Sequence, residues 1–169
     1  LNTLASTLAV RYPQDRRVVE LYAKHLIASG ELEQALALYK LHLDDQPPVE
    51  EYFRSVIDIE SYLQHPDSVN RYIGHALELF PGQVDFHLSK GHTLNYSKQY
   101  PQAIKAYKQS LGYARTDSLR SVIWGFIGDT WHQKATAGEQ DIDDDFARAV
   151  RKGSFRADMK QCYKAYDHS

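Results

Sequence analysis

Histidine and aspartate side chains give this chain its clearest candidates for acid–base or metal chemistry. The sequence holds eight histidines. Asp129 and His132 are three residues apart, so on a helix they would be neighbours, and with His92 from an adjacent helix they could form an acid–base or metal-binding cluster. His87 and His92 are five apart, which places them on different helix faces, unlike the four-residue spacing of a zinc helix. We expect an ordinary polar surface and keep the cluster as an alternative.

The acidic run at residues 141–145, Asp-Ile-Asp-Asp-Asp, could bind calcium through its carboxylates. A calcium loop needs oxygen ligands at defined spacing and a turn glycine, and no glycine follows at the required place. Basic residues follow the run instead, ending with Arg151 and Lys152. Acids at the start and bases at the end suit the dipole of a short helix, and we expect one here.

Other motifs of catalysis are missing from the sequence. It contains neither a glycine-rich phosphate loop nor the G-x-S-x-G pattern of a serine nucleophile. Cys162 is the single cysteine, which excludes an internal disulfide framework and a cysteine-rich zinc site. We therefore expect no enzyme activity, no cofactor and no metal.

Composition is that of an ordinary globular protein. Of 169 residues, 43% are hydrophobic and 25% charged, and the net charge is -2. Without a basic excess, binding through nucleic-acid phosphates is not expected. No apolar run reaches the roughly 20 residues that cross a bilayer. The sequence leaves the compartment open between the cytoplasm and an exported location.

The positions that would carry any site are set by an internal repeat. Pro13, Pro47 and Pro81 are spaced by 34 residues. Windows 16–49, 50–83 and 84–117 share this phase. Their second halves carry one apolar stripe with four-residue spacing, which predicts a helix with one buried face. The columns are Ala35, Val69 and Ala103; Tyr39, Ile73 and Tyr107; and Leu43, Leu77 and Leu111.

Further segments match the same register. Trp124-x-x-Ile127-Gly128-x-x-Trp131 opens a fourth unit, residues 118–169, whose second half is resumed near Cys162 to Tyr166 after an insertion at about 136–158. Residues 1–15 match the second helix of a truncated unit. The middle window departs from the pattern at Ile57 and Glu60.

A period of 34 with a W-x-x-L-G-x-x-Y signature resembles the tetratricopeptide repeat (TPR), in an array of the bacterial type of which this chain would be a piece. The resemblance implies an all-α fold: a right-handed α–α superhelix of stacked antiparallel helix pairs, forming a single solenoid domain over 1–169. The expected helices span 2–11, 15–29, 31–45, 49–63, 66–80, 84–97, 100–114 and 118–135.

In this family, certain first-helix positions line a concave groove that binds peptides. Carried over to this sequence, the resemblance implies a groove with charged, aromatic and amide groups. These are Arg17, Lys24, Arg54, Asp58, Tyr62, His92, Asn95, Tyr96, Asp129 and His132. The carboxylate clamp of TPR co-chaperones is not expected, because Glu20 and Asp85 would repel a carboxylate.

The predicted function is therefore a scaffold that binds a protein or peptide of unknown identity in this groove. The alternative is an architectural role, as a spacer or a self-associating segment of a longer array. In that case the exposed terminal helices could join copies into a homo-oligomer.

Overall fold

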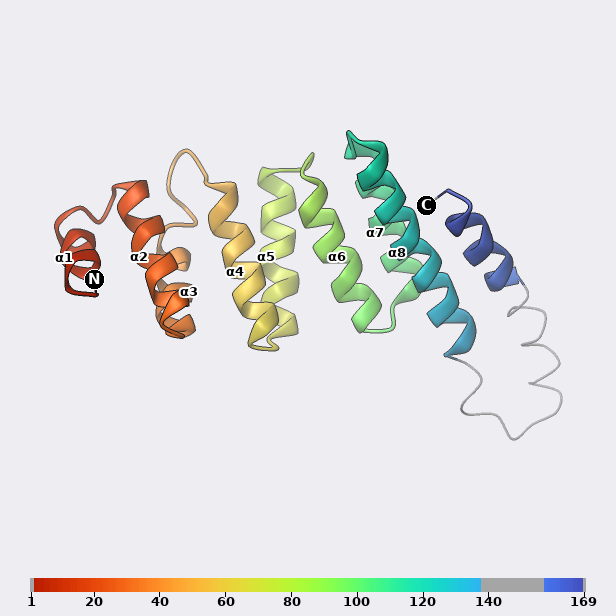
Figure 1. Cartoon of the computed structure of the whole chain (residues 1–169), viewed down its shortest axis with the longest axis horizontal. Coiled ribbons are helices and arrows are strands. Elements are labelled where there is room, and N and C mark those ends of the chain that lie inside the picture. The colour runs from red at the N-terminus through yellow and green to blue at the C-terminus, as the bar shows by residue number, and fades with distance from the viewer. Residues whose placement is uncertain (1, 138–156, 169) are drawn as a thin grey trace. The chain divides into compact units, whose positions relative to one another are not determined.

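The computed structural model describes residues 2–137 and 157–168. All regular secondary structure in these residues is helical. The helices are α1 (Asn2–Arg11), α2 (Arg16–Ala28), α3 (Leu32–Leu41), α4 (Glu50–Tyr62), α5 (Pro66–Leu79), α6 (Val84–Tyr96), α7 (Tyr100–Tyr113) and α8 (Asp117–Thr136), followed by helical residues 157–166 (Figure 1). The all-α fold of successive helix pairs is confirmed. The helix predicted from the acidic run 141–145 lies outside the described residues.

Two compact units make up the chain. Unit 1 spans Leu1–Phe80 and unit 2 spans Pro81–Ser169, so the boundary falls at the third of the evenly spaced prolines. In unit 1, α2 packs on α3, α3 on α4 and α4 on α5; in unit 2, α6 packs on α7 and α7 on α8. The repeat boundaries 16–49, 50–83, 84–117 and 118–169 stay a prediction.

The turn between the two helices of a pair repeats with the sequence period. Gly30, Gln64 and Lys98 are spaced by 34 residues, and each has a positive φ, of 77°, 59° and 59°. Glycine adopts this left-handed conformation freely, whereas Gln64 and Lys98 adopt it at some cost. The backbone therefore repeats the same turn even where the side chain does not favour it.

Helix starts follow from local sequence. The Asp15 side chain accepts a hydrogen bond from the Arg17 N–H, and the Thr116 side chain accepts one from the Leu119 N–H, so both cap a helix N-terminus. Pro66 and Pro101 lie in the first turns of α5 and α7, where a missing N–H breaks no helical hydrogen bond.

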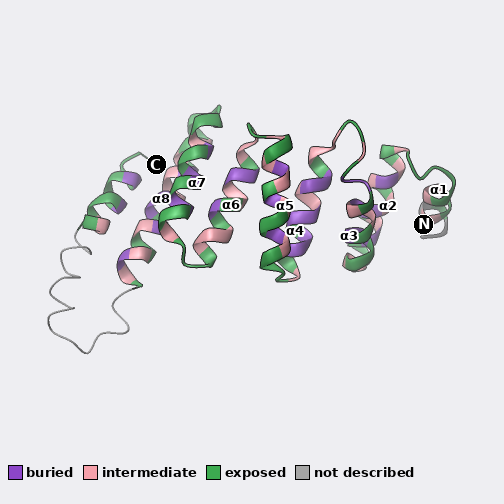
Figure 2. Cartoon of the chain, turned by 180° about the vertical axis from the view of Figure 1, so that it is seen from behind, coloured by how far each residue is buried: buried purple, intermediate pink, exposed green. Residues whose placement is uncertain are grey.

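The interior is built from the predicted apolar columns. Ala35, Val69 and Ala103 are buried, as are Tyr39, Ile73 and Tyr107. Leu43 is also buried, while Leu77 and Leu111 are half-buried. Figure 2 shows the result for one pair: α4 is buried along much of its length, and α5 keeps a wide exposed side.

Two glycines allow tyrosine rings to lie directly on a first helix. A Cβ atom at Gly91 would collide with the ring of Tyr107, and one at Gly128 would lie 2.8 Å from the ring of Tyr166. Neighbouring backbones can approach closely only where a side chain is missing. Residues 157–166 thus pack on α8 through Tyr166 in the way that α7 packs on α6 through Tyr107.

One predicted helix is too long. The span 31–45 was expected to be helical, but α3 ends at Leu41 and an eight-residue loop, 42–49, leads to α4. The other links between a second helix and the next first helix have three or four residues. Leu43 still points into the core from the loop, so the burial pattern continues after the helix has ended.

The irregular middle window is accommodated by a buried ion pair. Glu60 is only 1% exposed, and its carboxylate lies 2.6 Å from Lys40 Nζ and 2.7 Å from His65 Nδ1. Burial alone would raise the pKa of Glu60, but the hydrogen bonds from Lys40 and His65 lower it below its usual value. The carboxylate therefore remains charged inside unit 1. Lys40 Nζ also lies 5.2 Å from the centre of the Tyr72 ring.

Candidate peptide-binding site

The predicted groove residues of unit 1 stand on α2 and α4 and lie outside the core. Arg17, Lys24, Asp58 and Tyr62 are exposed, and Arg54 is half-buried. Tyr62 ends α4 with 75% of its surface exposed. We name this surface of α2 and α4 the first-helix face of unit 1. It can offer an aromatic ring and several charges to a partner.

Two arginines on this face are paired with acids of the same helix or its cap. Arg17 Nη2 lies 3.4 Å from Asp15, and Arg54 forms an ion pair with Glu50 and lies 3.9 Å from Glu51. Such exposed pairs contribute little to stability. They do offset the charges of the two arginines.

In unit 2, His92 is held by aromatic neighbours. Its Nδ1 lies 2.9 Å from the Tyr107 hydroxyl, and its ring meets Phe126 of α8 edge-on at 4.7 Å between centroids. Burial lowers the pKa of His92 below its ordinary value, and burial raises the pKa of Tyr107 to about 12. The tyrosine keeps its proton and can donate it to Nδ1, which leaves the Nε2–H of a neutral imidazole for another acceptor.

Asp129 is held in the same way by the last helical segment. The Tyr166 hydroxyl donates to its carboxylate at 2.6 Å, and this hydrogen bond raises the pKa of Tyr166 above its usual range. Asp129 and His92 occupy equivalent places in their repeats, each reached by a tyrosine that crosses a glycine. In both repeats, a tyrosine hydroxyl therefore fixes a polar side chain of the first helix by a hydrogen bond.

The remaining predicted residues of unit 2 lie on α6 and α8. Asn95 donates from Nδ2 to Gln133 Oε1 at 3.0 Å and so links the two helices. Tyr96 is 86% exposed at the end of α6, and His132 is exposed on α8. We name this surface of α6 and α8 the first-helix face of unit 2.

The alternative of a metal-binding cluster at His92, Asp129 and His132 finds no support in the described residues, and the acid–base alternative stays a prediction. His92 and Asp129 are each hydrogen-bonded to a different tyrosine. Within residues 2–137 and 157–168, no group of three or more His, Cys, Asp or Glu side chains is arranged to hold a metal. His87 faces away from His92, as predicted: it is buried, with Nε2 2.8 Å from the carbonyl oxygen of Pro81.

Sequence reasoning missed the residues that hold this face in place. Tyr107, Tyr166 and Phe126 contact groove positions but were assigned to the interior or to no role. A usable signal was present: Gly91 and Gly128 mark where a tyrosine ring can cross a first helix. In unit 1 that position is Ala23, and Tyr39 hydrogen-bonds Ser55 instead.

Comparison with known proteins identifies the fold. No family model matches the chain, and no curated protein is significantly similar to it. Two crystal structures of MamA, a TPR-repeat protein, match it with a TM-score of 0.67 and 11% identity. They cover 98% of this chain and 86% and 81% of the MamA chains. In the described residues, no helix has the length and apolarity to cross a membrane. The chain thus has the all-α helical-repeat fold of tetratricopeptide-repeat proteins.

Proposed function

We propose that this protein is a scaffold that binds an extended segment of another protein on its first-helix faces. The observation that carries the proposal is the fixed orientation of polar side chains on the first helices of unit 2. His92, Asn95 and Asp129 are each held by a neighbouring side chain, at 2.9, 3.0 and 2.6 Å. Side chains ordered before binding lose less entropy when a partner arrives.

The chemistry of the two faces suits a protein segment. Asn95 Nδ2 carries a second N–H besides the one that Gln133 accepts, and the neutral imidazole of His92 can donate from Nε2. Tyr62 and Tyr96 add exposed rings, and tyrosine is enriched among residues that dominate binding energy. These features support polar contacts to a backbone with aromatic anchors beside them. The proposal assigns the protein no catalytic role.

The test is affinity capture with the variant Tyr62→Ala, Tyr96→Ala. A partner captured by the unchanged protein should bind the variant at least about tenfold more weakly, because truncating a hot-spot aromatic costs 1–2 kcal/mol or more. The matched control is Tyr113→Ala, Tyr163→Ala, which removes two exposed tyrosines outside α2, α4, α6 and α8. Equal loss in both variants, or full binding by the first, would contradict the proposal.

A second candidate is an architectural role through self-association. It is favoured by exposed apolar side chains near the N-terminus, namely Leu4, Val10 and Leu21, and by Tyr163 in the last helical segment. Sedimentation should then show concentration-dependent association that Leu21→Ser weakens. A strict monomer over a hundredfold range of concentration would exclude it.

A further inference from the structure

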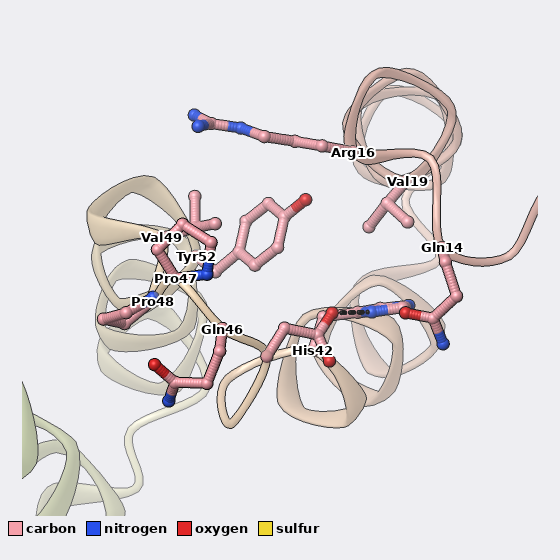
Figure 3. Close-up of a pocket in the computed structure, with 10 residues that line it drawn as sticks. Gln14, Arg16, Val19, His42, Gln46, Pro47, Pro48, Val49 and Tyr52 are labelled. Carbon is pink, nitrogen blue, oxygen red and sulfur yellow. Dashed lines mark hydrogen bonds and ion pairs between the residues drawn. The ribbon is translucent and has the colours of Figure 1, made fainter.

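The short α3 leaves a pocket in unit 1 that is separate from the predicted groove residues. Its volume is about 330 Å³, and it lies between the first turns of α2 and α4, above the loop 42–49 (Figure 3). The loop has eight residues, against three or four in the other links of its kind, because α3 stops at Leu41. The pocket is therefore a local departure from the repeat.

Apolar side chains form the floor and one wall of this pocket. Val19 and Tyr52 are buried, and Figure 3 shows the Tyr52 ring between Val49 and Val19. Pro47 and Pro48 add two rigid rings from the loop. Such a lining favours an uncharged ligand group with a flat apolar surface.

The polar side chains of His42, Asp45 and Arg16 at the pocket already have partners. His42 is 3% exposed, and its Nδ1 lies 2.7 Å from the Asp45 carboxylate. Arg16 lies 2.7 Å from Glu20 through Nε. Because Arg16 and Asp45 each already have a partner, the pocket offers a charged ligand no unpaired counter-charge, and we infer a neutral ligand.

Two carboxamides complete the lining. Gln14 precedes α2 and Gln46 belongs to the loop, and both are exposed, one on either side of His42 in the view of Figure 3. Each carboxamide offers a donor and an acceptor, which can pair with the C=O and the N–H of a peptide unit. An apolar floor with amides at its rim matches one side chain together with its flanking peptide bonds.

We propose that this pocket binds an uncharged aromatic residue of the partner segment, with Gln14 and Gln46 hydrogen-bonded to the peptide bonds beside it. This inference rests on the proposed function, since the ligand is part of a bound protein chain. It adds an anchor point that the repeat pattern does not predict and a preference for aromatic residues within the partner.

The test uses N-acetyl-L-tryptophanamide, a neutral aromatic residue with a peptide unit on each side. Nuclear magnetic resonance titration of the full chain should give saturable shifts at the amides of Gln46, Val49 and Tyr52. Gln14→Ala, Gln46→Ala should weaken binding about tenfold, because two hydrogen bonds are lost. Gln34→Ala, on the exposed side of α3, should change nothing. Val49→Phe, which fills the half-buried rim, should abolish the shifts while the helical circular dichroism stays the same.

Each opposite result overturns a stated part of the inference. Shifts elsewhere, or none, would exclude the pocket as the site. Equal binding by N-acetyl-L-leucinamide would remove the aromatic preference, and full binding by the double glutamine variant would remove the role of the carboxamides. The probe is expected to bind in the pocket and not on the first-helix faces. The variant Tyr62→Ala, Tyr96→Ala should therefore bind the probe with unchanged affinity. Failure of the pocket is thereby distinguished from failure of the proposed function.

Discussion

Unit 1 and unit 2 solve the same packing problem with different chemistry. In unit 2, Gly91 and Gly128 each admit a tyrosine ring, whose hydroxyl then holds a surface residue. In unit 1, the positions 34 residues before Gly91 and Tyr107 are Ile57 and Ile73, and the buried polar group of this repeat is the charged Glu60. A constant 34-residue register thus fixes where helices pack, while the interior contacts decide whether the surface above them is pre-ordered.

The largest expected effect comes from breaking the ion pair of unit 1. Lys40→Ala leaves the buried Glu60 carboxylate with His65 alone, so the free energy of unfolding should fall by about 3 kcal/mol. Chemical denaturation measures this loss. Lys24→Ala, which removes an exposed lysine of the same unit, is the control and should cost little. Lys40→Met, Glu60→Leu should recover most of the stability; a double variant as unstable as Lys40→Ala would show that the charge is not the cause.

Substitution at the contact between Gly91 and the Tyr107 ring in unit 2 should lower stability nearly as much. Gly91→Ala places a methyl group against the Tyr107 ring, and such overpacking costs about 2 kcal/mol. Thermal denaturation of Gly112→Ala gives the contrast, because a Cβ there meets nothing within 4 Å and alanine has a higher helix propensity than glycine. Equal melting temperatures for the two variants would contradict the packing described for Tyr107.

A smaller effect is expected from the His92 titration. Its pKa is lowered by burial, so the folded state releases the His92 proton more readily than the unfolded state does. Stability should therefore be fully present above the unfolded pKa, near 6.5, and should fall as the pH drops through the lower folded pKa. His92→Gln should flatten this part of the pH profile. A folded pKa at or above the ordinary value, measured by magnetic resonance, would contradict the partial desolvation of the ring by Tyr107 and Phe126.

The smallest effect should come from the surface link between α6 and α8. Asn95→Ala removes the hydrogen bond to Gln133 and should cost about 0.5–1 kcal/mol of stability. The free energy of partner binding should change by more than the free energy of unfolding, because the variant also lacks the contact that we propose between Asn95 and the ligand. Parallel titrations of stability and affinity separate the two; a loss confined to stability would give Asn95 a structural role only.

Much of the fold could be predicted because the repeat marks it several times over. The prolines at 13 and 81 lie two residues after the ends of α1 and α5, and the columns through Tyr39 and Tyr107 locate the buried side. The end of α3 could not be predicted in this way. Leu43 keeps its apolar place in the pattern and is buried, although the backbone has already left the helix, so side-chain periodicity carries no sign of the change.

The site was less predictable than the fold. Exposure of Tyr62 and Tyr96 follows from their place on a first helix, but the orientation of His92 and Asp129 depends on tyrosines 15 and 37 residues later in the chain. Such contacts are tertiary and have no short-range signature. The pocket beside Tyr52 could not be predicted from the sequence either, because it arises from a missing helical turn and not from a motif.

Photo-crosslinking tests the central claim most directly, because it reports which surface touches the partner. A p-benzoylphenylalanine replaces Tyr62 or Tyr96 on the first helices, or Leu41 or Tyr113 on the second helices, all of which are exposed. We expect crosslinks to the partner from positions 62 and 96 and none from 41 and 113. Crosslinks from 41 and 113 alone would show that the partner binds the opposite side of the helix pairs and would contradict the account.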